Sequence, residues 1–156
     1  MEFKSKARTC FFLQDGAEDA ARFYTTVLPD SEIDAVYRPD PSGPALVVEF
    51  TIAGVPYMTM NGNPEFQSSY SASVSVLTED QEETDRLWEQ LLADGGEEGQ
   101  CGWLKDRFGI YWQVVPKALP RLMHAGNPEV SGRVSTALMA MKKIDIATLE
   151  SAAGAG

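Results

Sequence analysis

The pattern of hydrophobic and polar positions predicts two similar halves followed by a helical tail. In the first half, a β-prone run at residues 9–13 precedes a stretch whose apolar side chains recur at the three- and four-residue spacing of an amphipathic helix. Three further β-prone runs follow, separated by turn-forming residues, at 33–37, 45–52 and 56–61. The first half is therefore expected to fold as β-α-β-β-β.

The same order begins again after a turn-rich connection at residues 61–66. The expected elements are a strand at 71–77, a helix with a buried stripe at 87–92, a short strand near 97–101 and a β-hairpin at 101–116 that turns at 105–109. Because the two halves correspond, we expect an α+β protein of two tandem βαβββ modules, at about 1–62 and 63–116. Their sheets are expected to curve around one concavity.

Two short motifs predict where the helices of the modules begin. Asp15 and Glu18 have the spacing of a capping box, with Asp15 as the N-cap of the first helix. Thr78 and Gln81 suggest the same arrangement for the second.

The remaining residues, 117–156, predict a C-terminal helical extension. A short helix is expected after Pro116, a second after an Asn127-Pro128 start, and a last turn capped by Asp145. Such an extension packs either on its own domain or on a second copy of the chain.

Alternation along the strands predicts which side chains face the concavity. Val74 and Val76 suit packing against a helix, so the serines between them point the other way. The same parity directs Gln113 inward and Trp112 outward. The predicted lining is Thr9, Phe11, Met58, Met60, Ser73, Ser75, Trp103, Tyr111 and Gln113. Mixed aromatic and polar linings are typical of small-molecule pockets, although the same groups also suit a closed core.

Composition narrows the classes of partner. The chain has 156 residues, which suits one domain, a formal net charge of −10 and a pI near 4.5. Such a surface repels phosphate backbones and anionic lipid, so we expect no nucleic-acid and no membrane partner. Two cysteines, Cys10 and Cys101, are too few for a disulfide framework. Without a signal-peptide pattern at the N-terminus, the protein is expected to be cytoplasmic.

Other candidate chemistry is weaker. Cys101 would need a neighbouring base or cation to act as a nucleophile, and an inert, partly buried thiol is the favoured interpretation. Lys105, Asp106 and Arg107 could form a polar rim that contacts a charged ligand. Three such residues are more often the solvated tip of a hairpin.

Several segments resemble the PhnB-like branch of the vicinal oxygen chelate superfamily, the fold of glyoxalase I, bleomycin-resistance proteins and extradiol dioxygenases. The segments that carry the resemblance are residues 15–24, 61–66, 101–109, 112–116 and 141–150. Members of this branch often carry the label 3-demethylubiquinone-9 3-methyltransferase. The resemblance implies a glyoxalase-like sheet around the concavity and a homodimer, but not one particular chemistry.

The resemblance also allows a test for a metal site. Metal-using members place ligands on the first and last strand of each module, which corresponds by spacing to Thr9, Met58, Ser73 and Gln113. A hard or borderline divalent ion prefers His, Glu or Asp at such positions. The single histidine, His124, lies in the tail and is expected at the surface. We therefore predict that the metal site has been lost and that no cofactor is bound.

The most economical hypothesis is a metal-free, PhnB-like protein that binds an unidentified small molecule. One alternative is a metal-dependent lyase or dioxygenase relative of glyoxalase that uses Gln113 with an unusual ligand set. Another is the methyltransferase of the family label. A Rossmann-type methyltransferase would show a glycine-rich turn between a strand and a helix, whereas Gly95-Gly96 follows a helix. No catalytic residues are assigned.

Overall fold

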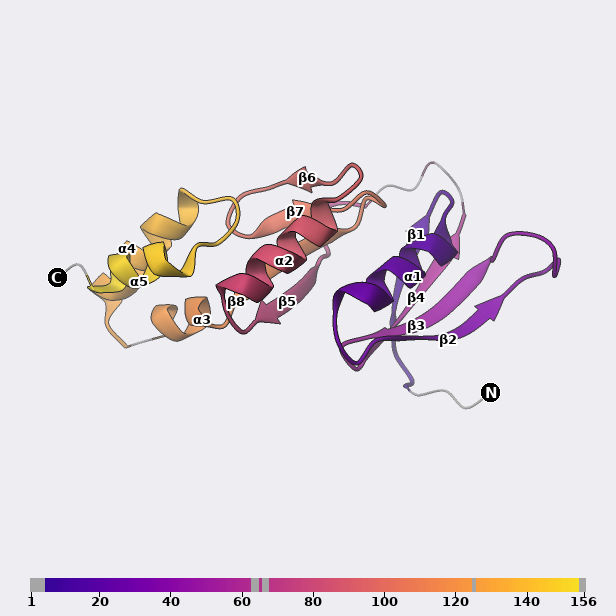
Figure 1. The fold of residues 1–156 in the computed structure, drawn as a ribbon, viewed down its shortest axis with the longest axis horizontal. Helices are drawn as coiled ribbons and strands as arrows, with labels where there is room; N and C mark the ends of the chain where they lie inside the picture. The colour runs from indigo at the N-terminus through magenta and orange to yellow at the C-terminus, as the bar shows by residue number, and fades with distance from the viewer. Residues whose placement is uncertain (1–4, 63–64, 66–67, 125, 155–156) are drawn as a thin grey trace. The chain divides into compact units, whose positions relative to one another are not determined.

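The structure is a computed structural model that describes residues 5–62, 65, 68–124 and 126–154 (Figure 1). The chain divides into two compact units, residues 1–67 and 68–156. The elements of the first unit are β1 (Thr9–Leu13), α1 (Ala17–Val27), β2 (Glu32–Tyr37), β3 (Val47–Ile52) and β4 (Val55–Asn61). They form a four-stranded sheet in the order β1-β4-β3-β2, in which β1 is parallel to β4 and the other pairs are antiparallel.

The second unit repeats this arrangement and adds three helices. Its elements are β5 (Val74–Thr78), α2 (Gln81–Leu92), β6 (Glu97–Glu98), β7 (Trp103–Lys105), β8 (Tyr111–Pro116), α3 (Ala118–Met123), α4 (Pro128–Met139) and α5 (Ile146–Gly154). The sheet order is β5-β8-β7-β6, with β5 parallel to β8. The predicted α+β fold of two tandem βαβββ modules with a helical extension is confirmed, and neither sheet is closed.

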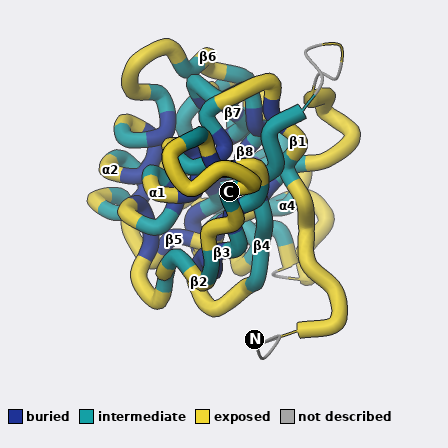
Figure 2. Tube along the Cα trace, turned by 90° about the vertical axis from the view of Figure 1, so that its right-hand side faces the viewer, coloured by how far each residue is buried: buried dark blue, intermediate teal, exposed yellow. Residues whose placement is uncertain are grey.

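In the first unit, one face of the sheet packs against α1. Alternate residues of β3, Val48 and Phe50, are fully buried, and Tyr24 of α1 is buried with them. The rings of Tyr24 and Phe50 lie 6.1 Å apart. Burial of such apolar area is the main force that holds helix and sheet together. Residues 5–8, which precede β1, are exposed (Figure 2).

The start of α1 is held differently from the predicted capping box. The N-cap is Gly16, and no side chain of its own caps the helix. Instead, Asn61 at the end of β4 accepts a hydrogen bond from the Ala17 N–H at 2.9 Å, and Thr59 donates to the Ala17 carbonyl at 2.7 Å. The prediction of Asp15 as N-cap is therefore wrong, because a side chain distant in sequence satisfies the free helical N–H.

In the second unit, Trp112 and Val114 of β8 are fully buried, as are Leu87 and Leu91 of α2. The helix α2 begins two residues later than the predicted cap implied. Its N-cap is Asp80, whose carboxylate accepts the Glu83 N–H at 2.8 Å. Thr78 instead belongs to β5, and its buried hydroxyl lies 2.6 Å from that of Thr84. The cap assigned to Thr78 is thus wrong by two residues.

The hairpin between β7 and β8 turns around a buried carboxylate. Asp106 is 1% exposed and accepts hydrogen bonds from the N–H groups of Phe108 and Ile110, at 2.9 and 3.0 Å. It also accepts one from the indole of Trp112 at 2.8 Å. Asp106 therefore belongs to the frame of the turn and not to a solvated tip. Of its neighbours, Lys105 pairs with Glu97 and Arg107 with Asp94.

The helical extension packs on the second module. Its small core consists of Val134, Ile144 and Leu149, all fully buried. The backbone carbonyls of Met141 and Lys142 accept the N–H groups of Cys101 and Gly102, at 2.8 and 2.7 Å. The predicted starts of its helices are confirmed, because Asn127 caps α4 and Asp145 accepts the Thr148 N–H at 2.7 Å.

Gln81 of α2 makes a second connection between the module and the extension. Its amide donates to the Ile144 carbonyl at 3.1 Å, and its side-chain oxygen accepts the Ile146 N–H at 2.8 Å.

Within the described residues, none of the helices is both long and apolar enough to cross a membrane.

Candidate functional site

The sheet of the second unit has one face covered by α2 and one open face, and the open face carries most of the predicted site. Gln113 of β8 stands beside Ser75 of β5 and Trp103 of β7 in the strand register. Its amide donates a hydrogen bond to the Ser73 hydroxyl at 2.8 Å. The residues that alternate with them, Val74 and Trp112, are buried. The structure thus brings the predicted polar residues of the second module together on one face.

An aromatic cluster lies beside this polar group. The ring of Tyr111 is 4.3 Å from that of Tyr70, and Tyr70 is 5.9 Å from Trp103. Tyr70 is 65% exposed, so much of its ring faces solvent. The sequence pattern missed Tyr70, because it precedes β5 in a loop where no strand periodicity marks a facing side chain. Its only signal was an aromatic residue among small polar ones.

Lys105 places a cation next to the aromatic cluster. Its ammonium pairs with Glu97 at 2.7 Å, and Lys105 stands beside Tyr111 in the strand register. The carboxylate of Glu97 raises the pKa of Lys105. The lysine is therefore charged at all physiological pH values.

Several polar groups on this open face lack a hydrogen-bond partner in the part of the chain that the structure describes. Among the described residues, nothing hydrogen-bonds to the side-chain oxygen of Gln113, the hydroxyls of Ser75, Tyr70 and Tyr111, or the indole N–H of Trp103. Ser75 and Tyr70 are exposed and the other three are half-buried. Solvent or a ligand must therefore satisfy these donors and acceptors.

The first module departs from the predicted face. Phe11 stacks on Tyr57 at 5.5 Å and meets Tyr24 of α1 edge-on at 6.1 Å, so Phe11 faces the helix. Thr9 is two residues away on the same side of β1 and pairs with Tyr57. The prediction that Thr9 and Phe11 share a face with Met58 is therefore wrong. A one-residue error in strand parity moves every side chain to the other face.

The open face of the first sheet carries Met58 and Met60, as predicted by alternation, since Tyr57 and Thr59 face α1. The β1 residues beside the two methionines are Cys10 and Phe12. Partial burial raises the pKa of the Cys10 thiol, which keeps it protonated near neutral pH.

The residues at the positions where related proteins place metal ligands are poorly suited to bind a metal ion. With the parity of β1 corrected, the residue beside Met58 is Cys10, and the nearby carboxylate, Glu49, pairs with Arg8 at 2.9 Å. In the second unit, the corresponding groups are the amide of Gln113 and the hydroxyl of Ser73. In the described ranges, no three His, Cys, Asp or Glu residues come together as a cluster. Cys10 and Glu49 are of a type that binds Zn²⁺, but the thiol has a raised pKa and the carboxylate is paired with Arg8. The thioether, hydroxyl and amide groups at the other positions are poor ligands for Zn²⁺ or Mg²⁺.

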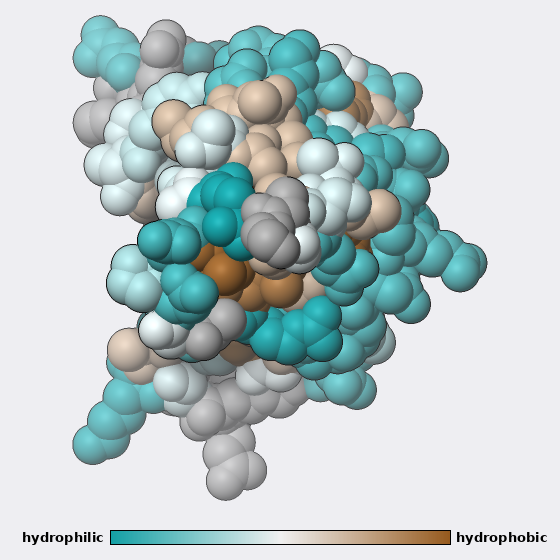
Figure 3. All heavy atoms as spheres, turned by 90° about the vertical axis from the view of Figure 1, so that its left-hand side faces the viewer, coloured by the Kyte–Doolittle hydropathy of each residue, from teal (hydrophilic) through white to brown (hydrophobic). Residues whose placement is uncertain are grey.

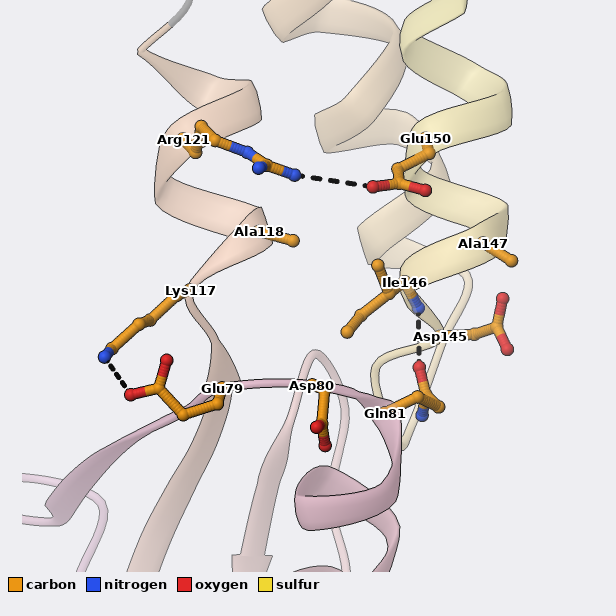
Figure 4. Close-up of a pocket in the computed structure, with 10 residues that line it drawn as sticks. All are labelled: Glu79, Asp80, Gln81, Lys117, Ala118, Arg121, Asp145, Ile146, Ala147 and Glu150. Atoms are coloured by element: carbon orange, nitrogen blue, oxygen red, sulfur yellow. Dashed lines mark hydrogen bonds and ion pairs between the residues drawn. The ribbon is translucent and has the colours of Figure 1, made fainter.

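A cleft of about 570 Å³ lies elsewhere, where the extension meets the start of α2 (Figure 4). Arg121 of α3 and Glu150 of α5 pair across it at 3.4 Å, and Lys117 pairs with Glu79. In a view of this end of the molecule, hydrophobic residues lie in a hollow between hydrophilic ones (Figure 3). The described residues that line the cleft include no aromatic side chain, whereas the open sheet face combines aromatic rings with polar groups, so we regard the open sheet face as the better candidate site.

Cys101 and His124, the other residues with reactive or metal-binding side chains, lie away from the open sheet face in local contacts of their own. Cys101 is half-buried, and its sulfur lies 3.7 Å from that of Met139. His124 is exposed, with one ring nitrogen 2.7 Å from the Pro120 carbonyl. The turn-rich connection at 61–66 is described only in part, at residues 61, 62 and 65.

Comparison with known proteins finds a matching family model and solved structures with a similar fold. A family model described as 3-demethylubiquinone-9 3-methyltransferase matches residues 5–115. Among solved structures, a PhnB protein from Bacillus cereus with the same description is similar, with 29% identity and a TM-score of 0.65. The match covers 72% of this chain and 99% of that one. The comparison with curated proteins finds no match.

Two further structures share the fold at lower identity. A protein from Pseudomonas aeruginosa is 18% identical with a TM-score of 0.59, over 72% of this chain and 98% of that one. The fosfomycin resistance protein FosX from Mesorhizobium loti is 16% identical with a TM-score of 0.53, over 71% and 90%. The region matched by the family model ends before α3, so the helical extension lies outside it. The chain belongs to the PhnB-like family of the vicinal oxygen chelate superfamily, whose model carries the description 3-demethylubiquinone-9 3-methyltransferase.

Proposed function

We propose that this protein binds a small molecule on the open faces of its module sheets, without a metal ion. The observation that supports this most directly is the arrangement around Gln113. Its amide is fixed by Ser73, its oxygen has no partner among the described residues, and three aromatic rings lie beside it. Ligand sites commonly combine apolar walls with a few such placed polar groups. On the sheet of the first module, Met58 and Met60 line the corresponding open face.

The test is a thermal-shift screen of chemically diverse small molecules, followed by NMR mapping of each stabilising compound. The expected result is a compound that shifts the side-chain amide signals of Gln113 and loses most of its affinity in Gln113→Leu. Gln90→Leu is the matched control, because Gln90 lies on α2, where its side-chain oxygen accepts a hydrogen bond from Arg86 at the helix surface. If the stabilising compounds shift only residues away from the open faces, the proposal is wrong.

We further propose a homodimer in the cytoplasm. The dimer is supported by membership of the PhnB-like family and by large apolar side chains that remain exposed, including Phe12, Val55 and Leu77. The cytoplasm is supported by two cysteines, both unpaired, which suit a reducing compartment.

A metal-dependent lyase or dioxygenase is the first alternative, and the fold shared with FosX is what favours it. The donors around Gln113 argue against it, as described above. We expect the purified protein to contain no stoichiometric divalent ion by elemental analysis. A stoichiometric ion that is lost in Gln113→Leu would establish the alternative instead.

The methyltransferase of the family description is the second alternative. The connection from β5 to α2 is Glu79-Asp80, without the glycines that approach a dinucleotide-type cofactor in Rossmann enzymes. We expect S-adenosylmethionine to give no saturable heat by calorimetry, whereas saturable binding would favour methyl transfer.

A further inference from the structure

We propose that the ligand of the second module is a planar aromatic compound that carries a negative charge. This inference rests on the proposed function and adds the chemical class of the ligand. It is carried by the aromatic cluster of Tyr70, Trp103 and Tyr111 and by the lysine at its edge.

The geometry of the cluster favours a flat partner. Tyr70 and Tyr111 are in contact at 4.3 Å between ring centroids, with 39° between their planes, so no space for a ligand remains between them. The cluster therefore offers outer ring faces and edges and does not enclose a cage for a cation. Tyr70 is the most exposed of the three, and a second aromatic ring could stack on it or meet it edge-on.

The charge beside the cluster selects the sign of the ligand. Lys105 stands beside Tyr111 in the strand register, and the carboxylate that neutralises its ammonium, Glu97, is 69% exposed at its side chain. An exposed ion pair of this kind contributes little to stability, so a ligand carboxylate or phenolate can replace Glu97 at little cost. A cationic ligand would instead be repelled by Lys105.

The polar groups of the face complete the match. The indole N–H of Trp103 and the hydroxyl of Tyr111 can donate to an anion, and the Gln113 oxygen can accept from a ligand hydroxyl. A hydroxylated aromatic acid would use all of these groups together with the rings.

The experiment uses three probes of similar size. They are 2-naphthoate, which is planar and anionic, decahydro-2-naphthoate, which has the same charge but is not planar, and 2-naphthylmethylammonium, which is planar but cationic. Binding is followed in the full chain through the indole N–H signals of its three tryptophans, of which Trp88 and Trp112 are buried. Trp103→Phe identifies the Trp103 signal.

We expect 2-naphthoate to shift the Trp103 signal and to bind about tenfold more tightly than either other probe. Tyr70→Ala should weaken this binding by about fivefold. Lys105→Met should remove the preference for naphthoate over the cation, and Glu97→Gln should strengthen naphthoate binding, because it frees the lysine. Tyr37→Ala and Lys142→Met are matched controls. Tyr37 is an exposed tyrosine of β2, and Lys142 pairs with Glu98 at 2.9 Å.

Equal binding of the three probes, no shift of the Trp103 signal, or a shift that survives Tyr70→Ala unchanged would overturn the aromatic-anion inference. This failure is distinguishable from failure of the proposed function. If the screen finds another class of compound whose binding depends on Gln113, the proposed function stands and only the ligand class is wrong.

Discussion

Single side chains decide the geometry of the open face, and Asp106 is the clearest case. It is an acidic residue at a hairpin turn, a position where sequence patterns favour solvent exposure, yet it is almost completely buried. It collects three hydrogen bonds and thereby fixes both the turn and the indole of Trp112 behind Gln113. The site residues on β8 therefore depend on a residue that never touches the ligand face.

We predict that Asp106→Ala lowers the free energy of unfolding by about 3–5 kcal/mol, because it removes the acceptor of two buried N–H donors and of the partly buried Phe108 N–H. Urea denaturation measures the change. Asp94→Asn is the control, since Asp94 is 82% exposed at its side chain and its pair with Arg107 spans 3.6 Å. The control should change stability by less than about 0.5 kcal/mol. Equal losses in the two variants would contradict the role given to Asp106.

The ion pairs of Glu18 should make the stability of the folded protein depend on pH. Its carboxylate pairs with Arg22 at 2.7 Å and with Arg38, and both guanidinium groups hold the pKa of Glu18 below its usual value. A carboxyl whose pKa is lowered by folding stabilises the folded state above its unfolded pKa of about 4.3, and loses this contribution as the pH falls through the lower, folded value.

We therefore predict that Glu18→Gln is less stable than the unsubstituted protein at pH 7, and that the difference shrinks as the pH falls below about 4. Denaturant titrations at several pH values measure it. Glu89→Gln is the control, because Glu89 is exposed on α2 and forms no ion pair within the described ranges. A difference that stays constant down to pH 2.5 would show that the charge of Glu18 is not involved.

At the scale of elements, the extension and the hairpin meet at Gly102. The backbone of Gly102 has a φ of 83°, and a Cβ there would lie 2.7 Å from the Val114 carbonyl oxygen and 2.8 Å from the Ile144 side chain. Two constraints therefore require glycine at this position. One is the left-handed backbone, and the other is the close approach of the Val114 carbonyl and of Ile144, which precedes α5. The residue after it is Trp103, so this junction also positions the aromatic cluster.

We predict that Gly102→Ala destabilises the protein by about 3–5 kcal/mol, from backbone strain and from the clash together. Gly109→Ala is the matched control, because Gly109 has a φ of 85° but nothing within 4 Å of an added Cβ. It should cost only the strain, about 1–2 kcal/mol. Thermal and denaturant unfolding of the two variants measure how much the clash of the added Cβ adds to the backbone strain. A Gly102 variant as stable as the Gly109 variant would exclude the close contact.

The sequence predicted the elements well where periodicity is strong, and it predicted which side chains share a face where alternation is clear. In β5 and β8, serine or glutamine alternates with valine or tryptophan, so the parity around Gln113 could be read directly. The run Thr9-Cys-Phe-Phe-Leu13 has two adjacent phenylalanines, which leaves its parity ambiguous, and Phe11 was assigned to the wrong face. The predicted cap of α1 failed for a different reason, because Asn61 reaches Ala17 from a strand distant in sequence.

At the scale of the whole molecule, the duplicated module is the most predictable feature, since the same order of patterns occurs twice along the chain. Its assembly with a second copy is a proposal. We predict a sedimentation mass near twice the chain mass of 17.1 kDa at micromolar concentration. Analytical ultracentrifugation measures this mass directly, and a monomer across that concentration range would remove the homodimer from the proposed function.

The bonds from residues 141–146 to the second module also affect the order in which the chain can fold during synthesis. All strands and the helix of the first module are present once β4 has emerged. The second module is different, because Ile144 and the carbonyls that hold Cys101 and Gly102 emerge only after α3 and α4. A nascent chain that ends at β8 therefore presents an unfinished hairpin to chaperones and proteases, next to a finished first module.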